Sequence, residues 1–407
     1  MNHSEPAPNW ETALDIVVQA ARVKEVETLD ITSAVGRTLA SSILASTDFP
    51  AFNRSSVDGF ALRSTDVASS PTVLRIAGTI TAGTVPKEDL QSGQCMRVMT
   101  GAAIPIGADA VVPAENVVVR GGDIEVGTVV KSGYGCTFQG AEYSKGAEVI
   151  ASGTQIGASE VGLMAEIGIQ QTLVHKAPTV ALIVTGDELV EPWVNPRPGQ
   201  IRNSNAYTLL TLFRQVGVSP HYLGICPDSL PALSEKILSG MQDDLVVVVG
   251  GSASGDKDYL REVLGGLGME ILIDGARFKP GGTFILCRRK TCLVMGLPGP
   301  PGATRTVFHL LLHPLLRKMM GSRKPIPTLY SGVLKGSFAK PEGVEFFLGV
   351  KASFVDDRYV LEQTKGKSTE SWKPWKSDDA LVRIPQDVTE VKDGERVRFL
   401  FTNPCME

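Results

Sequence analysis

The stretch that decides the fold reads LVVVV at residues 245–249 and continues into GGSASGDKD at residues 250–258. Five consecutive apolar, mostly β-branched residues without polar alternation predict a strand buried on both faces, as in a parallel sheet. The glycines that follow allow the backbone to approach a ligand closely, because they carry no Cβ and tolerate positive φ. Taken alone, the loop admits two interpretations, a site for a cation and an anion or a strand–helix junction capped by Asp256.

Strands and helices alternate on both sides of this stretch. Strands are expected at 179–184, 219–224, 245–249 and 292–296, and helices at 204–216, 229–240, 257–267 and 302–319. Such alternation predicts a parallel sheet with helices on both faces. Residues 10–45 and 140–176 show helical periodicity, whereas 46–139 and the last 85 residues are rich in short β segments. The chain therefore combines a central α/β region with flanking helical and β regions.

The composition is that of an ordinary globular protein and excludes several classes. The 407 residues are 43% hydrophobic with a net charge of −4, so no basic field favours nucleic acid. No apolar run approaches the roughly 18 residues of a membrane span, and the first residues contain no secretory signal. The six cysteines form no C-x-x-C pair, which is typical of reduced thiols in a cytoplasmic protein.

Three small-residue loops follow successive predicted strands. TGDEL at 185–189 follows the strand VALIV, and GGSASGDKD at 250–258 follows LVVVV. The third loop, GLPGPPG at 296–302, begins at the last residue of the strand that starts with CLVM. In open α/β sheets ligands bind beyond the carboxyl ends of the strands. Carboxylates hold hard cations, and the start of the helix after 302 offers N–H groups to an anion. The three loops together predict a site for a phosphorylated ligand and a cation.

Two segments outside the α/β region carry similar chemistry. SSVDGFA at 55–61 contains a carboxylate before a glycine, and TGAA at 100–103 is a hydroxyl-and-glycine loop. On spacing alone, either segment is more typical of ordinary turn chemistry than of a site. With these two included, the ordered set of motifs resembles the molybdopterin molybdenumtransferase family, which inserts molybdenum during molybdenum-cofactor synthesis. The other matching pieces are PGQIRNSN at 198–205 and KPG at 279–281.

This resemblance implies a multidomain architecture and a dimer. We expect a discontinuous helical linker domain (1–45 and 140–176), a β insertion domain (46–139), an α/β molybdopterin-binding domain (177–323) and a C-terminal β-barrel-like domain (324–407). Family members are homodimers with the active site between subunits. They cleave adenylylated molybdopterin, release AMP and leave molybdenum from molybdate on the dithiolene, assisted by Mg²⁺. The adenylyltransferase of the same pathway is an expected partner. Binding to nucleic acid or to a membrane is not expected.

The resemblance also assigns roles to individual residues. Catalytic roles are expected for Asp58, Thr100, Glu188, Asp228 and Asp256, with Mg²⁺ held by Glu188 and Asp256. Substrate-binding roles are expected for Gly186, Asp187, Ser204, Gly250, Gly251, Ser252, Ser254, Asp258, Lys279, Pro298 and Gly299. Loop N–H groups at 251–255 and 298–302 are expected to cradle the phosphate, and Lys279 to lie near molybdate or phosphate. Two alternatives stay open, since Asp228 also suits a helix N-cap and Lys279 a solvated surface position.

Four positions depart from the family pattern, at Ala253, Gly282, Pro300 and Leu348. The changes remove a hydroxyl, a lysine, an amide and an arginine, so potential oxyanion donors are lost. Candidates to replace the lost charge are Lys351, Arg383 and the pair Lys365 and Lys367. The departures leave two alternatives to a working insertase. One is a divergent paralogue that binds molybdopterin for delivery, modification or tungstate handling, and the other is a dimeric scaffold, which the retained acids disfavour.

Overall fold

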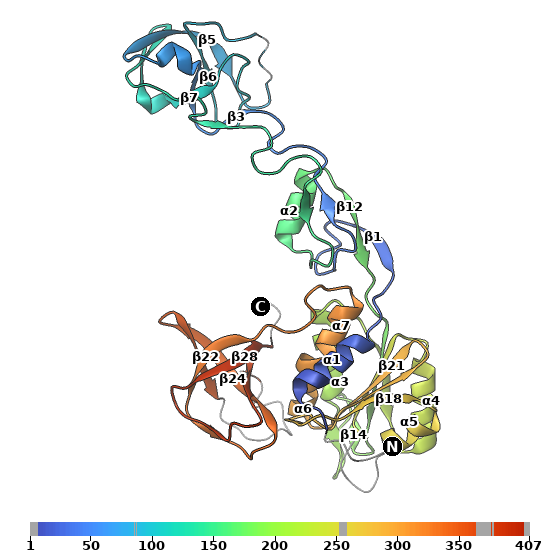
Figure 1. Ribbon diagram of the computed structural model, residues 1–407. Helices are drawn as coiled ribbons and strands as arrows, with labels where there is room; N and C mark the ends of the chain where they lie inside the picture. The colour runs from blue at the N-terminus through green and yellow to red at the C-terminus, as the bar shows by residue number, and fades with distance from the viewer. Residues whose placement is uncertain are drawn as a thin grey trace. The chain divides into compact units, whose positions relative to one another are not determined.

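The structure is a computed structural model that describes residues 7–84, 86, 88–251, 259–363, 376 and 378–402. The chain forms two compact units (Figure 1). One consists of Met1–Ser41, Ser152–Ala158 and Gln171–Glu407, and the other of Ser42–Ala151 and Ser159–Gln170. The division into four domains expected from the sequence stays a prediction.

The first unit is built around a six-stranded sheet. Its order is β16 (His221–Cys226), β13 (Val180–Thr185), β17 (Leu245–Val249), β21 (Cys292–Leu297), β20 (Ile285–Arg289) and β18 (Glu270–Asp274). The first four strands are parallel, which confirms the strands expected from the sequence. The last two are antiparallel and were not predicted. The α/β core is therefore a mixed sheet with a parallel centre.

Alternate residues of the central strands point into two separate cores. Val247 packs in the core that contains α1 (Trp10–Ala20), α3 (Asn205–Gln215) and the continuous helical segment α6 (Pro301–Val307), η3 (Phe308–Leu312) and α7 (His313–Met319). Val248 packs in the opposite core, under α4 (Leu230–Gly240) and α5 (Tyr259–Gly266). Figure 1 shows these helices on the two faces of the sheet. Burial on both faces explains why the strand has no polar alternation.

The helical structure expected across residues 10–45 is wrong beyond α1, which ends at Ala20. After α1 the chain forms β1 (Val26–Asp30), which pairs antiparallel with β12 (Gln171–His175). Side chains of β1 alternate between exposed and half-buried, which is the period of a strand in a thin ribbon. Pairing between residues about 145 positions apart overrides the local pattern, because propensity alone is a weak determinant. The flanking region is thus partly a β ribbon.

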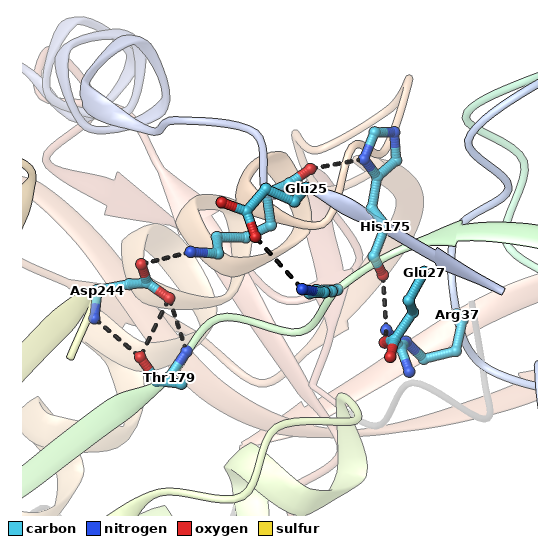
Figure 2. A network of polar contacts seen from close by, with 8 residues as sticks. Glu25, Glu27, Arg37, His175, Thr179 and Asp244 are labelled. Atoms are coloured by element: carbon cyan, nitrogen blue, oxygen red, sulfur yellow. Dashed lines mark hydrogen bonds and ion pairs between the residues drawn. The ribbon is translucent and has the colours of Figure 1, made fainter. Parts of the chain in front are cut away.

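A polar network anchors the base of this ribbon to the α/β core (Figure 2). Lys24 Nζ lies 2.6 Å from Asp244 Oδ1, and the N–H of Thr179 donates to Asp244 Oδ2 at 2.8 Å. The Nδ1 atom of His175 lies 2.9 Å from the carbonyl oxygen of Lys24. Asp244 therefore ties β1 to the segment that enters β13.

The C-terminal part of the first unit is a closed five-stranded barrel. Its order is β24 (Glu345–Val355), β25 (Arg358–Gln363), β22 (Tyr330–Lys335), β28 (Arg396–Phe401) and β26 (Ala380–Ile384), and β26 pairs back with β24. Two-residue strands β23 (Phe338–Ala339) and β27 (Glu390–Val391) form a separate pair. The barrel joins the α/β core through β19 (Phe278–Lys279), which pairs with β24, and confirms the expected C-terminal β-barrel-like domain.

The second unit is a six-stranded sheet with short additional pairs. The sheet order is β7 (Ala110–Pro113), β4 (Gly59–Leu62), β6 (Gln94–Val98), β5 (Thr72–Ile80), β9 (Asp123–Val126) and β8 (Val117–Arg120). Its remaining elements are η1 (Ser64–Val67), η2 (Ala114–Asn116), α2 (Ala158–Glu166) and the pairs β2 (Ile43–Leu44) with β11 (Glu148–Ile150) and β3 (Arg54–Ser55) with β10 (Cys136–Thr137). The expected β insertion is therefore present.

The described cysteines at 95, 136, 226, 287 and 292 are free thiols. Among the described residues, no helix combines the length and the hydropathy that a membrane crossing requires.

Candidate functional site

The strand register brings the ligand-type loops to one edge of the sheet. Val249 pairs with Val184 of β13 and with Leu297 of β21, so these three strands end level with one another. The segments after residues 185, 249 and 297 therefore leave the sheet side by side. This is the arrangement that the sequence predicted from parallel strands.

Gly250 is required for this close approach. It adopts φ of +92°, and a Cβ atom at this position would lie 2.6 Å from the carbonyl oxygen of Thr185. Its N–H donates to the carbonyl oxygen of Leu297 at 3.0 Å, so one residue links all three loops. A side chain here would both strain the backbone and separate the loops.

A cleft of about 1280 Å³ opens over this edge of the sheet. Its volume exceeds the range typical of small-molecule sites, so it admits a large ligand. The predicted site residues that line it are Gly186, Asp187, Glu188, Ser204, Asp228, Gly250, Gly251, Lys279, Pro298 and Gly299. The short strands β14 (Leu189–Val190) and β15 (Ile201–Arg202) supply another part of its wall.

Three carboxylates gather on the side of the cleft formed by β13 and β16. The Thr185 hydroxyl donates to Asp228 Oδ1 at 2.7 Å, and the N–H of Asp228 donates to Asp187 Oδ1 at 3.1 Å. The Glu188 carboxylate lies over Gly186, where a Cβ atom would be 2.7 Å from its Oε2. The helix-cap alternative for Asp228 does not hold, because the Ser229 side chain caps α4.

Two asparagines of the cleft were not predicted as site residues. Asn205 Nδ2 donates to the carbonyl oxygen of Gly299 at 2.7 Å, and its Oδ1 is buried without a partner among the described residues. Asn203 Oδ1 accepts from the N–H of Ala206, whereas the predicted Ser204 makes no capping hydrogen bond. Both asparagines flank Ser204 in the NSN motif, so the sequence pointed to the segment and not to the side chains.

The loop at 298–302 offers fewer donors than expected. Residues 298, 300 and 301 are proline, which has no N–H, so only Gly299 and Gly302 retain one. The hydroxyl of Thr304 donates to the carbonyl oxygen of Pro298 at 2.6 Å and holds the loop against α6. The expectation that N–H groups throughout this segment cradle a phosphate is therefore corrected to two donors.

Among the described residues, Arg277 and Lys279 are the cationic side chains that line the cleft. Lys279 is exposed, and Arg277 is partly buried. Arg277 was not singled out by the sequence analysis, since nothing in the motif pattern marks the position before Phe278.

Of the residues proposed to replace lost charge, the described Arg383 and Lys351 do not line the cleft. Arg383 hydrogen bonds to Glu345, donates to Glu11 Oε1 at 2.8 Å and covers the ring of Trp10. Lys351 is exposed on β24 and is not among the described lining residues, while Leu348 packs inside the barrel. Lys365 and Lys367 lie outside the described residues. Arg383 is therefore a structural contact between barrel and α1.

Asp58 and Thr100 meet in the second unit. The N–H and the hydroxyl of Thr100 both donate to Asp58 Oδ1, at 2.6 and 2.8 Å. The backbone hydrogen bond, and after it the side-chain one, lowers the pKa of Asp58 below its ordinary value. The two predicted residues thus form a preorganised carboxylate, which Thr100 orients.

The remaining predicted residues, Ser252, Ser254, Asp256 and Asp258, lie outside the described residues, as does Ala253. Within the described part of the chain, no group of three or more His, Cys, Asp or Glu side chains is placed to hold a metal ion. Mg²⁺ commonly uses only one or two carboxylates together with phosphate oxygens and water. The pair Glu188 and Asp256 is compatible with that donor set.

Two family descriptions match adjoining parts of the chain. The "MoeA N-terminal region (domain I and II)" matches residues 9–168, and the "probable molybdopterin binding domain" matches residues 181–318. A molybdopterin molybdenumtransferase of Nostoc sp. is 32% identical, covering 93% of this chain and 89% of that protein. One of Haemophilus influenzae is 31% identical, covering 92% and 93% respectively.

Solved structures agree with these relatives over the whole fold. Two structures of a molybdopterin biosynthesis protein from Pyrococcus horikoshii have TM-scores of 0.80 and 0.81, with 29% and 25% identity. They cover 98% and 97% of this chain and 99% and 100% of their own. The chain belongs to the molybdopterin molybdenumtransferase family.

Proposed function

We propose that this protein inserts molybdate into adenylylated molybdopterin, with release of AMP, in the cleft above the α/β sheet. The observation that carries the proposal is the convergence of three strand-end loops, three carboxylates and two cations on one cleft. The relatives' name, molybdopterin molybdenumtransferase, supports the reaction. The large volume supports a substrate as extended as a pterin nucleotide.

The chain's own residues divide the work of such a reaction. Lys279 neutralises anionic charge on one wall, and the N–H groups of Gly251, Gly299 and Gly302 provide donors for phosphate oxygens. Glu188, Asp187 and Asp228 follow the ends of β13 and β16, where their charges repel a phosphate that carries no metal ion and favour a bound cation. Burial of the Thr185 hydroxyl beneath Asp228 fixes one of these acids in position.

We assign Mg²⁺ to Glu188 and Asp256, and the structure describes Glu188 of this pair. A bound Mg²⁺ neutralises phosphate charge and orients the leaving group. Chelation with EDTA is expected to abolish AMP release, and added Mg²⁺ is expected to restore it. Release that persists in EDTA would remove Mg²⁺ from the account.

We further propose a cytoplasmic homodimer in which Asp58 and Thr100 of one subunit complete the cleft of the other. The preorganised Asp58 carboxylate supports a role in a site, because two of its hydrogen bonds come from one glycine-turn residue. Mixing Asp58→Asn with Glu188→Gln subunits tests this directly. If the sites are shared, half of the dimers are mixed and carry one intact site, so roughly a quarter of the activity returns.

The function is tested by AMP release from purified adenylylated molybdopterin, with and without molybdate. Molybdate-dependent release that Asp256→Ala abolishes supports insertion. Tight binding of the nucleotide without release would instead indicate a protein that only carries or modifies the cofactor. The pathway's adenylyltransferase, which makes this substrate, is the partner to add when the substrate is generated in place.

A further inference from the structure

Arg277 is a cation of the cleft that the roles described so far leave unused. It lines the cleft, and its Nε is buried without a hydrogen-bond partner among the described residues. No described carboxylate forms an ion pair with it, whereas the partly buried Arg37 and Arg383 pair with Glu27 and Glu345. A buried donor without a partner costs free energy, so its retention calls for a ligand.

The backbone of Arg277 is held on both sides. Its N–H donates to the carbonyl oxygen of Pro8 at 2.8 Å, and its own carbonyl oxygen accepts from the N–H of Glu345 at 3.0 Å. The next residue, Phe278, is buried in the α/β core, whereas Lys279 returns to the cleft. The base of the arginine side chain is therefore fixed before any ligand arrives.

The charges of the described part of the cleft favour a second cationic side chain beside Lys279. Three carboxylates line the described part of the wall, yet the proposed substrates are oxyanions that carry further negative charge. A guanidinium presents several N–H donors in one plane and binds tetrahedral oxyanions through two of them at once. Arg277 supplies this geometry, which the point charge of Lys279 does not.

Gly282, the position where the family pattern has a lysine, cannot take this role. At Gly282, a Cβ atom would lie 2.3 Å from the carbonyl oxygen of Ala276 and 2.4 Å from that of Phe278. The loop thus closes on itself where a longer side chain would otherwise enter. Arg383 of the barrel is committed to Glu345 and Glu11.

We propose that Arg277 binds a tetrahedral oxyanion in the cleft, either free molybdate or a phosphate of the nucleotide. The inference rests on the proposed function for the identity of these ligands. It goes beyond that function by naming a residue that the motif pattern does not mark. Because the guanidinium has no described protein partner, its removal is expected to leave folding intact.

The test compares Arg277→Gln and Arg277→Lys with a matched control, Arg358→Gln, which removes an exposed arginine of β25 away from the cleft. Steady-state AMP release is measured while molybdate and adenylylated molybdopterin are varied in turn. Loss of charge-assisted hydrogen bonds predicts a rise of about ten-fold or more in one half-saturating concentration for Arg277→Gln. Arg277→Lys is expected to show a smaller rise, because it keeps the charge, and Arg358→Gln is expected to match the wild type.

The arms of the experiment separate the two sources of oxyanion. A rise for molybdate alone identifies molybdate as the ligand, and a rise for the nucleotide alone identifies its phosphate. Unchanged half-saturation for both, with Arg277→Gln folded by circular dichroism, overturns the proposal. Calorimetric titration with molybdate and with AMP makes the outcome independent of turnover. One outcome separates the two proposals. If the wild type binds molybdate or AMP but catalyses no release of AMP, and Arg277→Gln binds the same ligand more weakly, the role of Arg277 is supported and the proposed reaction is refuted.

Discussion

Replacing Gly250 with alanine tests how closely the strand-end loops must approach. Two costs are expected. The φ of +92° is strained for an L-residue, by about 1–3 kcal/mol, and the added Cβ would lie 2.6 Å from the carbonyl oxygen of Thr185. Relieving that overlap costs about a further 1–3 kcal/mol, whereas alanine recovers up to about 1 kcal/mol from the unfolded chain. The net loss of unfolding free energy is therefore about 3 kcal/mol.

Gly217 provides the matched control. It has a similar φ of +78° just after α3, but a Cβ atom there would meet nothing within 4 Å. Gly217→Ala therefore carries only the backbone cost, about 1 kcal/mol after the gain from the unfolded chain. Urea denaturation of both variants gives the difference, and AMP release is expected to fall only in Gly250→Ala. Equal destabilisation of the two variants would refute the close approach of the loops.

Three further predictions follow from local geometry. Thr100→Val removes the hydroxyl donor and keeps the N–H, so the pKa of Asp58 is expected to rise part of the way to its ordinary value, as measured by NMR titration. Burial lowers the pKa of His309 well below its ordinary value and that of His313 to about 4, so both are neutral in the fold. As the pH falls, both histidines are protonated in the unfolded chain before they are protonated in the folded protein. The free energy of unfolding is therefore expected to fall as the pH drops from about 6.5 toward 4, and to depend less steeply on pH in His309→Gln. Gly282→Lys is expected to destabilise the protein and not to tighten molybdate binding, as denaturation and titration would show.

The parallel centre of the sheet and its ligand edge follow from local sequence. Runs such as LVVVV have no polar face, so they fit only strands that are covered on both sides. By contrast, β1 depends on a partner far along the chain, β18 lies at the edge of the sheet, and β20 pairs with β21 across a tight turn. Their short patterns carry too little periodicity to distinguish strand from helix.

The site could be predicted at the level of loops and only partly at the level of side chains. Motif order indicated Glu188 and Asp228, yet the choice between helix cap and cleft for Asp228 needed the observation that Ser229 caps α4. Arg277 could not be found from the sequence, because it stands next to a buried residue and belongs to no motif. Its exposure to the cleft arises from backbone contacts with Pro8 and Glu345, which are distant in sequence.

The central claim is that the cleft over the carboxyl edge of the α/β sheet performs molybdate-dependent release of AMP. The most direct measurement is a single-turnover assay of Glu188→Gln against Glu235→Gln, a control with the same change on the exposed face of α4. We expect Glu188→Gln to lose AMP release by about a hundred-fold or more, the scale of a lost electrostatic contact in a site, while Glu235→Gln retains it. Equal activity of the two variants would contradict the placement of the active site in this cleft.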